Sequence, residues 1–401
     1  MANHNPISRI GDLADSISET HKLGKEKLIF LNTSDILHGK ILHRTYSAVK
    51  DWPGQAKKSI CKGDILFSEI RPANGRWAYV EENADDFVVS TKLMVIRTRQ
   101  DKLVPKFFYQ FLTSSKTTQW LQHLAESRSG TFPQITFDEV ASLELPLPSL
   151  ATQHAIASVL GSLDDKIELN RRMNETLEAL AQTLFKSWFV DVTQSALPKD
   201  WREVPLPEAI EVNPPRPLRK GQVAPYLDMA NMPTRSARAL EVIDREFGSG
   251  MRFKNGDTLV ARITPCLENG KSCFVDFLNR DQTAWGSTEY IVLRPKSPLP
   301  PEFAYFLART DEFRAFMIAN MTGTSGRQRV PAECLSNFKI AVPAAELAEK
   351  FGHFACAVFA HMKAHDDESR TLAALRDALL PKLLSGELRL PPAANLAEAA
   401  A

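Results

Sequence analysis

Hydrophobic and polar positions follow their most regular pattern beyond Pro148, where two interleaved series of mostly apolar residues each recur every seven positions. The members of the two series are Ile156, Leu163, Asn170, Leu177 and Leu184, and, four residues later, Leu160, Ile167, Asn174, Ala181 and Trp188. This spacing is typical of a helix that packs along one seam in a coiled coil. The pattern therefore predicts a long helix over residues 149–191.

The same pattern returns 195 positions later and predicts a second long helix over residues 344–389. Its two series are Phe351, Val358, His365, Leu372 and Leu379, and Ala355, Met362, Ser369, Arg376 and Leu383. Both seams become polar at equivalent positions, at Asn170 and Asn174 in the first helix and at His365 and Ser369 in the second. A single helix cannot bury such a stripe, and the copy of equal length is its obvious partner. Because a whole domain connects the helices, we expect them to run antiparallel as a spacer of roughly 55 Å.

Each long helix follows a segment with the signals of short strands and turns. Within residues 1–148, β-rich runs at 27–31, 64–69, 88–98 and 142–147 surround one helix expected around 106–126. Residues 192–343 repeat the landmarks, since Lys62-Gly-Asp-Ile-Leu66 matches Asn255-Gly-Asp-Thr-Leu259 and Asn74-Gly-Arg76 matches Asn269-Gly-Lys271. We therefore predict an α+β fold with two homologous mixed α/β domains, two antiparallel coiled-coil helices and a disordered tail over 390–401.

Composition narrows the class of protein. The 401 residues are 44% hydrophobic and 24% charged, which is typical of two or three globular domains. Lys plus Arg (49) nearly balance Asp plus Glu (48), so any affinity for nucleic acid must come from local basic patches. Apolar runs are too short to predict a membrane span, and the N-terminus lacks a signal-peptide core. Five scattered cysteines without a CxxC pair favour a reducing cytoplasm.

Several short motifs occur in an order that resembles one known family. The motifs are Leu145-Pro-Leu-Pro148, Ile156-Ala-Ser-Val-Leu160, Leu163-Asp-Asp-Lys-Ile167, Phe185-Lys-Ser-Trp-Phe-Val-Asp191 and Leu379-Leu-Pro-Lys-Leu-Leu-Ser-Gly-Glu-Leu388. With them, essentially the whole chain is similar to the specificity (S) subunit of Type I restriction-modification systems. The resemblance implies two target-recognition domains, each reading one half of a bipartite, asymmetric double-stranded DNA target, and helices that set the gap.

The resemblance also implies which tasks fall to other subunits. Modification (methyltransferase) subunits with S-adenosylmethionine, and restriction (endonuclease/translocase) subunits with ATP and Mg, would assemble on this chain. The chain itself is then expected to be a non-catalytic cytoplasmic subunit without a cofactor. The helical residues expected to form the coiled coil and to dock the modification subunits are Ile156, Leu160, Leu163, Ile167, Leu177, Leu184, Trp188, Phe351, Val358, Met362, Leu372 and Leu379.

A DNA-reading domain needs cations for phosphates and flat hydrogen-bonding side chains for base edges. Candidates in the first domain are Lys57, Lys58, Lys62, Arg71, Arg76, Arg128, Ser129 and Thr131. Those in the second are Arg216, Arg219, Lys220, Arg262, Lys271, Arg327 and Arg329. A single cation is more often a solvated surface charge, but here matching loops carry cations in both copies. We predict that roughly half of the set contacts DNA.

Motifs that would indicate catalysis or a metal site are incomplete. In Asn213-Pro-Pro-Arg216, Arg stands where the similar tetrapeptide of amino-methyltransferases has an aromatic residue to stack a flipped base. Gly270-Lys-Ser272 lacks the first glycine of a phosphate-binding loop, whose place is taken by Pro265. His353, Cys356, His361 and His365 would spread over several faces of one helix, whereas zinc ligands converge. We expect no catalytic and no metal site in this chain.

Two other functions compete with DNA recognition. A non-catalytic structural adaptor would bind proteins through its two domains, with the helices setting their spacing. A stand-alone nucleic-acid enzyme would need an active site that the incomplete motifs do not provide. A DNA-recognition subunit differs from an adaptor in a measurable way, because duplex binding through phosphates depends steeply on salt.

Overall fold

The computed structural model describes residues 5–22, 24–54, 56–128, 131–324 and 326–390. The chain divides into a first unit, Met1–Ile167 with Ser369–Ala401, and a second unit, Glu168–Glu368. The long helices are α4 (Leu150–Phe185) and α9 (Ala345–Ser385), and α4 continues through a π-helical segment (Lys186–Asp191) into α5 (Val192–Ser195). Each unit thus combines one mixed domain with a part of both helices, which differs from the linear division expected from the sequence. The tail at 391–401 lies outside the described residues.

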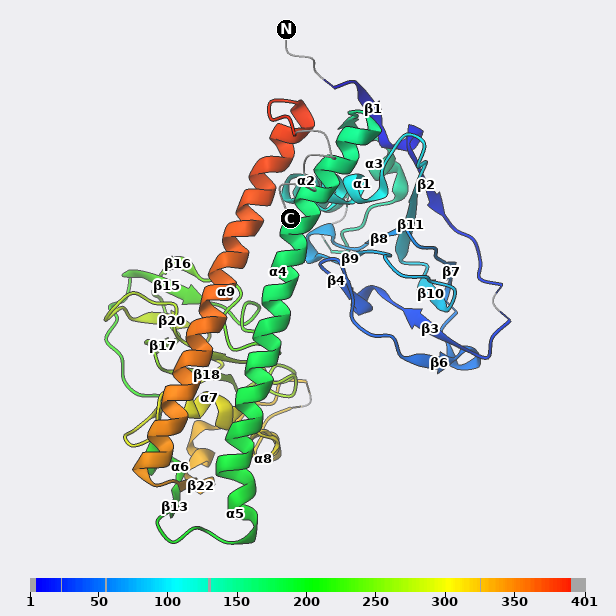
Figure 1. Cartoon of the computed structure of the whole chain (residues 1–401). Helices are drawn as coiled ribbons and strands as arrows, with labels where there is room; N and C mark the ends of the chain where they lie inside the picture. Colours follow the sequence, from blue (N-terminus) through cyan, green and yellow to red (C-terminus); the bar gives the residue numbers. More distant parts are fainter. Residues whose placement is uncertain (1–4, 23, 55, 129–130, 325, 391–401) are drawn as a thin grey trace. The chain divides into compact units, whose positions relative to one another are not determined.

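The first unit contains two four-stranded sheets with strand orders β6-β3-β10-β7 and β2-β11-β8-β9, and the small pairs β1-β12 and β4-β5 (Figure 1). Its strands are β1 (Ile7–Arg9), β2 (Ala14–Ile17), β3 (Lys27–Leu31), β4 (Ile36–Leu37), β5 (Lys40–Ile41), β6 (Tyr46–Ala48), β7 (Ala56–Ser59), β8 (Ile65–Ser68), β9 (Trp77–Tyr79), β10 (Phe87–Ser90), β11 (Leu93–Thr98) and β12 (Glu144–Pro146). Its helices besides the long ones are α1 (Pro105–Leu112), α2 (Ser115–Arg128) and α3 (Phe137–Ala141). The expected strand runs at 27–31, 64–69 and 142–147 are therefore present. The run at 88–98 is two strands of different sheets, β10 and β11, and the expected helix at 106–126 is two helices.

Strand β8 explains why the central runs of this unit are hydrophobic throughout. Successive side chains of a strand point to opposite faces. Ile65 and Phe67 join the core formed with the helices, which includes Phe107 of α1, whereas Leu66 joins the core formed with Leu31 of the other sheet. The sheet that contains β8 is therefore the middle layer of three, and both of its faces are buried.

The second unit repeats this architecture with strand orders β16-β15-β20-β17, β14-β21-β18-β19 and β13-β22. Its strands are β13 (Arg202–Pro205), β14 (Ile210–Val212), β15 (Val223–Leu227), β16 (Ile243–Glu246), β17 (Met251–Phe253), β18 (Thr258–Ala261), β19 (Ser272–Phe274), β20 (Ala284–Gly286), β21 (Tyr290–Pro295) and β22 (Lys339–Val342). Its short helices are α6 (Leu206–Ala209), α7 (Phe303–Ala308) and α8 (Asp311–Ala319). The same sheet order in both units confirms two homologous α+β halves.

Within each unit the segments of α4 and α9 run antiparallel. In the second unit, the Asn174 Nδ2 group donates to the carbonyl oxygen of Met362 (3.2 Å) and to Asp366 Oδ1 (2.8 Å). One turn earlier on α4, Asn170 Nδ2 donates to Glu368 Oε2 (2.8 Å), which lies later on α9. Asn174 Oδ1 also bonds to His365 Nδ1 (2.8 Å). The polar middle of the two helices, expected from the sequence, is therefore a hydrogen-bonded contact between them.

The apolar positions of the two long helices pack both against the other helix and on the domains. The Phe351 ring, for example, lies 5.1 Å from that of Phe189 and 6.3 Å from that of Trp188, and 5.6 Å from that of Phe306 in α7. In the first unit, Ile156 and Leu160 are fully buried in the core that includes α1, and Leu163 is half-buried against it. In the second unit, Phe351, Val358 and Met362 are buried in the core that includes α7. Of the other residues expected to dock the modification subunits, the half-buried ones are Ile167, Leu177, Leu184, Trp188, Leu372 and Leu379.

The end of α4 deviates most from the seven-residue pattern. Phe185 and Phe189 are buried, although neither belongs to the predicted series. Their rings pack on Phe303 of α7, with centroid distances of 4.9 and 5.2 Å. Phe185 already lies on this buried face in the α-helical part of the segment, and Phe189 continues the face in the π-helical part at Lys186–Asp191. Sequence periodicity therefore located the helix but missed its aromatic anchor.

Replacing Leu160 by Ala is expected to lower the free energy of unfolding by about 2–5 kcal/mol, because the side chain is fully buried and its removal leaves a cavity. The matched control is Leu169→Ala on the same helix, where 50% of the side chain is exposed and a change within about 0.5 kcal/mol is expected. Denaturant unfolding of both variants measures the difference. Equal losses would contradict the packing of α4 onto the first domain.

Candidate nucleic-acid interface

Two loops that are distant in sequence lie side by side in each unit. In the first unit, the Arg71 N–H donates to the Pro133 carbonyl oxygen (3.0 Å), and Ile70 forms a β-bridge with Gln134. We call residues 69–76 and 131–135 the first loop pair. It brings Arg71 and Thr131 into one surface region, and both residues are exposed. Ser129, predicted for the same region, lies outside the described residues.

The second unit has the corresponding arrangement. The Thr264 N–H donates to the Gln328 carbonyl oxygen (3.0 Å), and Ile263 forms a β-bridge with Arg329. We call residues 262–271 and 326–330 the second loop pair. It carries Arg262, Lys271, Arg327 and Arg329 from the predicted set. The structure thus joins the loops that the sequence analysis matched only by their order along the chain.

Several predicted cations are exposed and have no ion pair or side-chain hydrogen bond within the described ranges. They are Lys57, Lys62, Arg71, Arg219, Lys220 and Arg327. Free guanidinium and ammonium groups on loops and strand ends can reach phosphate oxygens without breaking contacts inside the protein. Only Arg71 and Arg327 of this group belong to the loop pairs.

Arg76 and Lys271 are different, because their charged groups face the protein. Arg76 Nη1 donates to the carbonyl oxygens of Ser34 (3.0 Å) and Ile36 (3.1 Å). The equivalent Lys271 Nζ donates to the carbonyl oxygens of Met229 (2.5 Å) and Ala230 (3.4 Å). The cation recurs in both copies because each holds a neighbouring loop in place. The recurrence of this cation is therefore no argument for DNA contact, contrary to the expectation from the sequence.

Lys58 and Arg216 also have internal partners. Lys58 is buried, its Nζ donates to the Leu93 carbonyl oxygen (2.8 Å), and burial lowers the pKa of its ammonium group. Arg216 Nη2 pairs with the fully buried Asp257 at 2.8 Å. Together with Arg76 and Lys271, these two residues are left out of the interface proposed below.

A buried aspartate recurs at the same place in both units. Asp64, which is 1% exposed, pairs with Arg97 Nε at 2.7 Å, and Asp257 pairs with Arg294 Nη1 at 3.2 Å. The repeated Gly-Asp motif found in the sequence is therefore a structural ion pair. Burying a carboxylate requires such partners. Arg97 and Arg294 were missed because the motif and its partner strand are distant in sequence.

Three other predicted arginines are ion-paired but partly exposed. Arg128 pairs with Glu139, which caps the short helix α3 together with Thr136. Arg262 and Arg329 both pair with Glu289, at 3.4 and 2.8 Å. These ion pairs orient the guanidinium groups and leave them accessible from solvent.

The tetrapeptide at 213–216 has internal roles at both ends. Asn213 Oδ1 accepts a hydrogen bond from the Val292 N–H (2.9 Å), and Arg216 belongs to the Asp257 ion pair. His365 of α9 bonds to Asn174, as described above. In the described part of the chain, no group of three or more His, Cys, Asp or Glu residues is placed to hold a metal ion. Nor does any helix there have the length and apolar character to cross a membrane.

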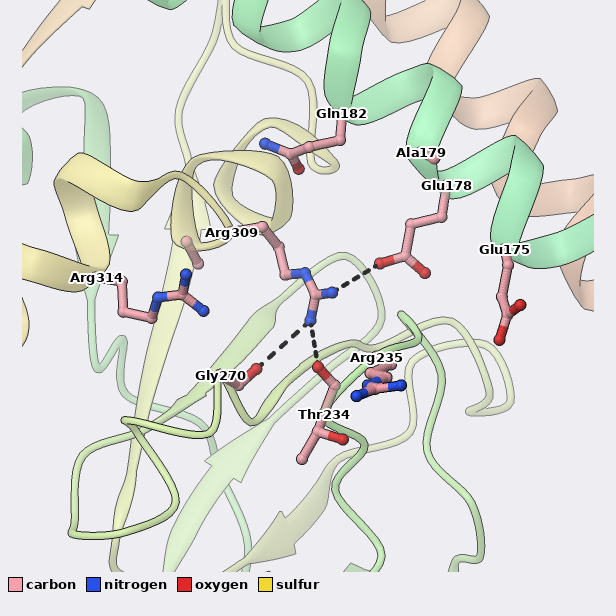
Figure 2. A pocket seen from close by; sticks show the side chains of 10 residues that line it. Glu175, Glu178, Ala179, Gln182, Thr234, Arg235, Gly270, Arg309 and Arg314 are labelled. Atoms are coloured by element: carbon pink, nitrogen blue, oxygen red, sulfur yellow. Dashed lines mark hydrogen bonds and ion pairs between the residues drawn. The ribbon is translucent and has the colours of Figure 1, made fainter. Parts of the chain in front are cut away.

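The second unit also contains a cavity of about 330 Å³ beside α4, whose lining includes Glu178, Arg235 and Arg309 (Figure 2). Arg309 points across it, pairing with Glu178 (3.5 Å) and donating to the Thr234 carbonyl oxygen (2.9 Å). Glu178 also accepts a hydrogen bond from the Tyr305 hydroxyl (2.5 Å), and burial raises the pKa of this carboxyl. The cavity is therefore crossed by contacts that attach α4 to the second domain.

Comparisons with known proteins relate part of this chain to one family. Residues 6–179 match the sequence model described as "Type I restriction modification DNA specificity domain". The specificity subunit of the Type I restriction enzyme HindI from Haemophilus influenzae is 52% identical over 183 residues. Over this part of the chain the sequence is therefore similar to Type I specificity subunits.

The extent of the family likeness varies. The HindI match covers 45% of this chain and 40% of that subunit. The MjaIX specificity subunit of Methanocaldococcus jannaschii is 24% identical over 318 residues, which cover 72% of this chain and 70% of that one. The solved S subunit from M. genitalium has a TM-score of 0.54 at 16% identity, covers 96% of this chain and 97% of its own, and supports the fold alone.

Proposed function

We propose that this chain is a specificity subunit that recognises a bipartite, asymmetric double-stranded DNA target, with each unit contacting one half. The observation that carries the proposal is that the first and second loop pairs have the same backbone hydrogen bonds and β-bridges but carry different side chains. Proteins that recognise different DNA sequences with one fold need a constant backbone at the DNA interface and variable side chains that contact the bases. Exposed cations on both units supply the attraction to phosphates.

We further propose that the helices set the gap between the half-sites and dock the modification subunits. Ile156, Leu160 and Met362 are buried inside the chain, so docking falls to other positions. The exposed leucines Leu169 and Leu180 of α4 are 50% and 48% accessible and suit an apolar partner surface.

Catalysis, in this proposal, resides in the partner subunits. Modification subunits would bind S-adenosylmethionine, and restriction subunits would bind ATP and Mg. The internal roles of Asn213 and Arg216 support a non-catalytic chain, because neither side chain is available to a substrate. The five cysteines are free thiols, which suits the reducing cytoplasm we propose as its location.

Salt-dependent duplex binding tests the proposal. We expect the complex of this chain with a modification subunit to bind its target with an affinity that falls linearly on a log–log plot against salt, with a slope of about −0.9 per phosphate contact. Replacing Arg71 and Arg327 by Ala should weaken binding to all sequences and reduce the slope by about one per lost contact. Titrations of labelled duplex at several salt concentrations measure both effects.

Arg280→Ala is the matched control, because Arg280 is 97% exposed but lies outside both loop pairs. It should leave the slope nearly unchanged. Salt-independent binding, or no duplex binding by the wild-type complex, would favour the protein-binding adaptor instead.

A further inference from the structure

Three positions in the first loop pair and its neighbouring strand end are joined by backbone hydrogen bonds. The Glu69 N–H donates to the Lys92 carbonyl oxygen (3.1 Å), and the Glu69 carbonyl oxygen accepts from the Ile135 N–H (2.8 Å). The next residue, Ile70, forms the β-bridge with Gln134. Glu69, Lys92 and Gln134 therefore occupy adjoining places, and we call them the first triad.

The second unit has the same three bonds. The Arg262 N–H donates to the Glu289 carbonyl oxygen (3.0 Å), and the Arg262 carbonyl oxygen accepts from the Val330 N–H (2.8 Å). Ile263 forms the β-bridge with Arg329. Arg262, Glu289 and Arg329 form the second triad, and they stand at the places held by Glu69, Lys92 and Gln134 in the first.

The side chains of the triads differ in charge although the backbone does not. The first triad has one weak ion pair, Lys92 Nζ to Glu69 Oε2 at 4.0 Å, and an exposed amide. In the second, one carboxylate pairs with two guanidinium groups. Because the first unit builds the same loop pair without any arginine at these places, the two arginines are not needed to form it.

The geometry of the second triad leaves its hydrogen-bond donors available. Arg262 and Arg329 contact Glu289 through Nε, and the side chains are 29% and 45% exposed. Within the described residues, neither arginine uses its Nη groups in a hydrogen bond. Glu289 is the positioning residue, since it holds both guanidinium planes and keeps their outer edges open to solvent.

We propose that the two triads set the base preference of the two half-sites, and that Arg262 and Arg329 contact guanine. This rests on the proposed DNA recognition. The paired Nη donors of arginine match the O6 and N7 acceptors of guanine in the major groove. The first triad offers an amide, a carboxylate and an ammonium group instead, and none of these has the planar pair of donors of a guanidinium group. The half-site read by the second unit contains guanine at these contacts, and the first unit reads the equivalent place with a different set of side chains.

The experiment uses the full chain with its modification subunit and selects bound duplexes from a pool with both half-sites randomised in turn. In the double variant Arg262→Gln, Arg329→Gln, we expect guanine discrimination to fall about 5- to 150-fold per lost contact in one half-site. The other half-site should be unchanged, which provides an internal control. A merely structural role would weaken binding to every sequence equally.

Two single variants keep the test decisive if the double variant is unstable. Arg329→Lys retains the charge but loses the planar fork, so guanine preference should drop while phosphate-driven affinity persists. Glu289→Gln should weaken the preference for guanine in the same half-site, because Arg262 and Arg329 lose the carboxylate that orients their guanidinium groups. Arg280→Gln removes one positive charge from the same unit, as each change of the double variant does, and should leave the base preference intact.

Unchanged guanine preference in Arg329→Lys, or in a folded double variant, would overturn the proposal. A wild-type motif without guanine in the half-site of the second unit would overturn the guanine assignment. If the wild-type complex failed to bind duplex at all, the proposed function itself would be wrong, which is a different result.

Discussion

Exchanging residues 10–142 for the corresponding segment of another specificity subunit is expected to change one half of the recognised motif completely and leave the other half as it was. The segment comprises the first loop pair, the first triad and both large sheets of the first domain. Its junctions lie just inside the β1-β12 pair, whose register runs from Ile7 opposite Pro146 to Arg9 opposite Glu144. The chimera therefore keeps this pair and both long helices native. Sequencing of methylated sites in a host that carries the chimera and its partner subunits measures the outcome.

The reciprocal exchange provides the control. Residues 206–338 lie just inside the β13-β22 pair, which joins Arg202–Pro205 to Lys339–Val342. This second chimera should change only the opposite half of the motif. If either exchange altered both halves, base recognition would depend on both units together, and one unit per half-site would be wrong.

The fold was largely predictable because its main signals are local or periodic. The run at Lys27–Leu31 is flanked by turn residues and forms β3 over the predicted bounds. The exact offset of 195 residues between helix starts, Leu150 and Ala345, follows from an ungapped repeat. What periodicity could not show is which surface the helices bury. Ile156 lies in a core with α1, and Phe351 packs on Phe189 of the other helical segment as well as on Phe306 of α7, so the surfaces that cover these residues depend on the tertiary structure.

The candidate interface was predictable only in outline. Arg71 and Arg327 were identified as cations in matching loops, and both are exposed. Arg76 was indistinguishable from Arg71 by sequence, because nothing local shows that its guanidinium reaches the carbonyl oxygens of Ser34 and Ile36. A hydrogen bond across about 40 residues becomes visible only when the chain is folded.

The triads illustrate the same limit. The match between 62–72 and 255–265 aligns Glu69 with Arg262, and this pairing alone looks like ordinary divergence. Its meaning appears when Glu289 and Arg329, from two other segments, are found in contact with Arg262 or beside it.

Lengthening both helices by one turn is expected to lengthen the gap between the half-sites by about one or two base pairs, with both half-sites unchanged. Four inserted residues add about 6 Å of helix and rotate the following segment by about 40° beyond a full turn. B-DNA rises about 3.4 Å per base pair, which sets the expected change in the gap. The insertions belong after Ile167 and after Glu368, where the unit boundary crosses α4 and α9. At these positions the contacts inside each unit, such as Asn174 with Met362, remain intact.

Insertion into α4 alone is the informative control. It lengthens one helix of an antiparallel pair, so the other must break or the contacts of Asn170 and Asn174 with α9 must shift register. We therefore expect loss of stability in the single insertion and retained folding in the paired one, measured by thermal unfolding. The methylated motif of the paired variant then decides the role of the helices. A folded, active variant with the original gap would mean that the helices serve as a docking surface and do not measure the DNA.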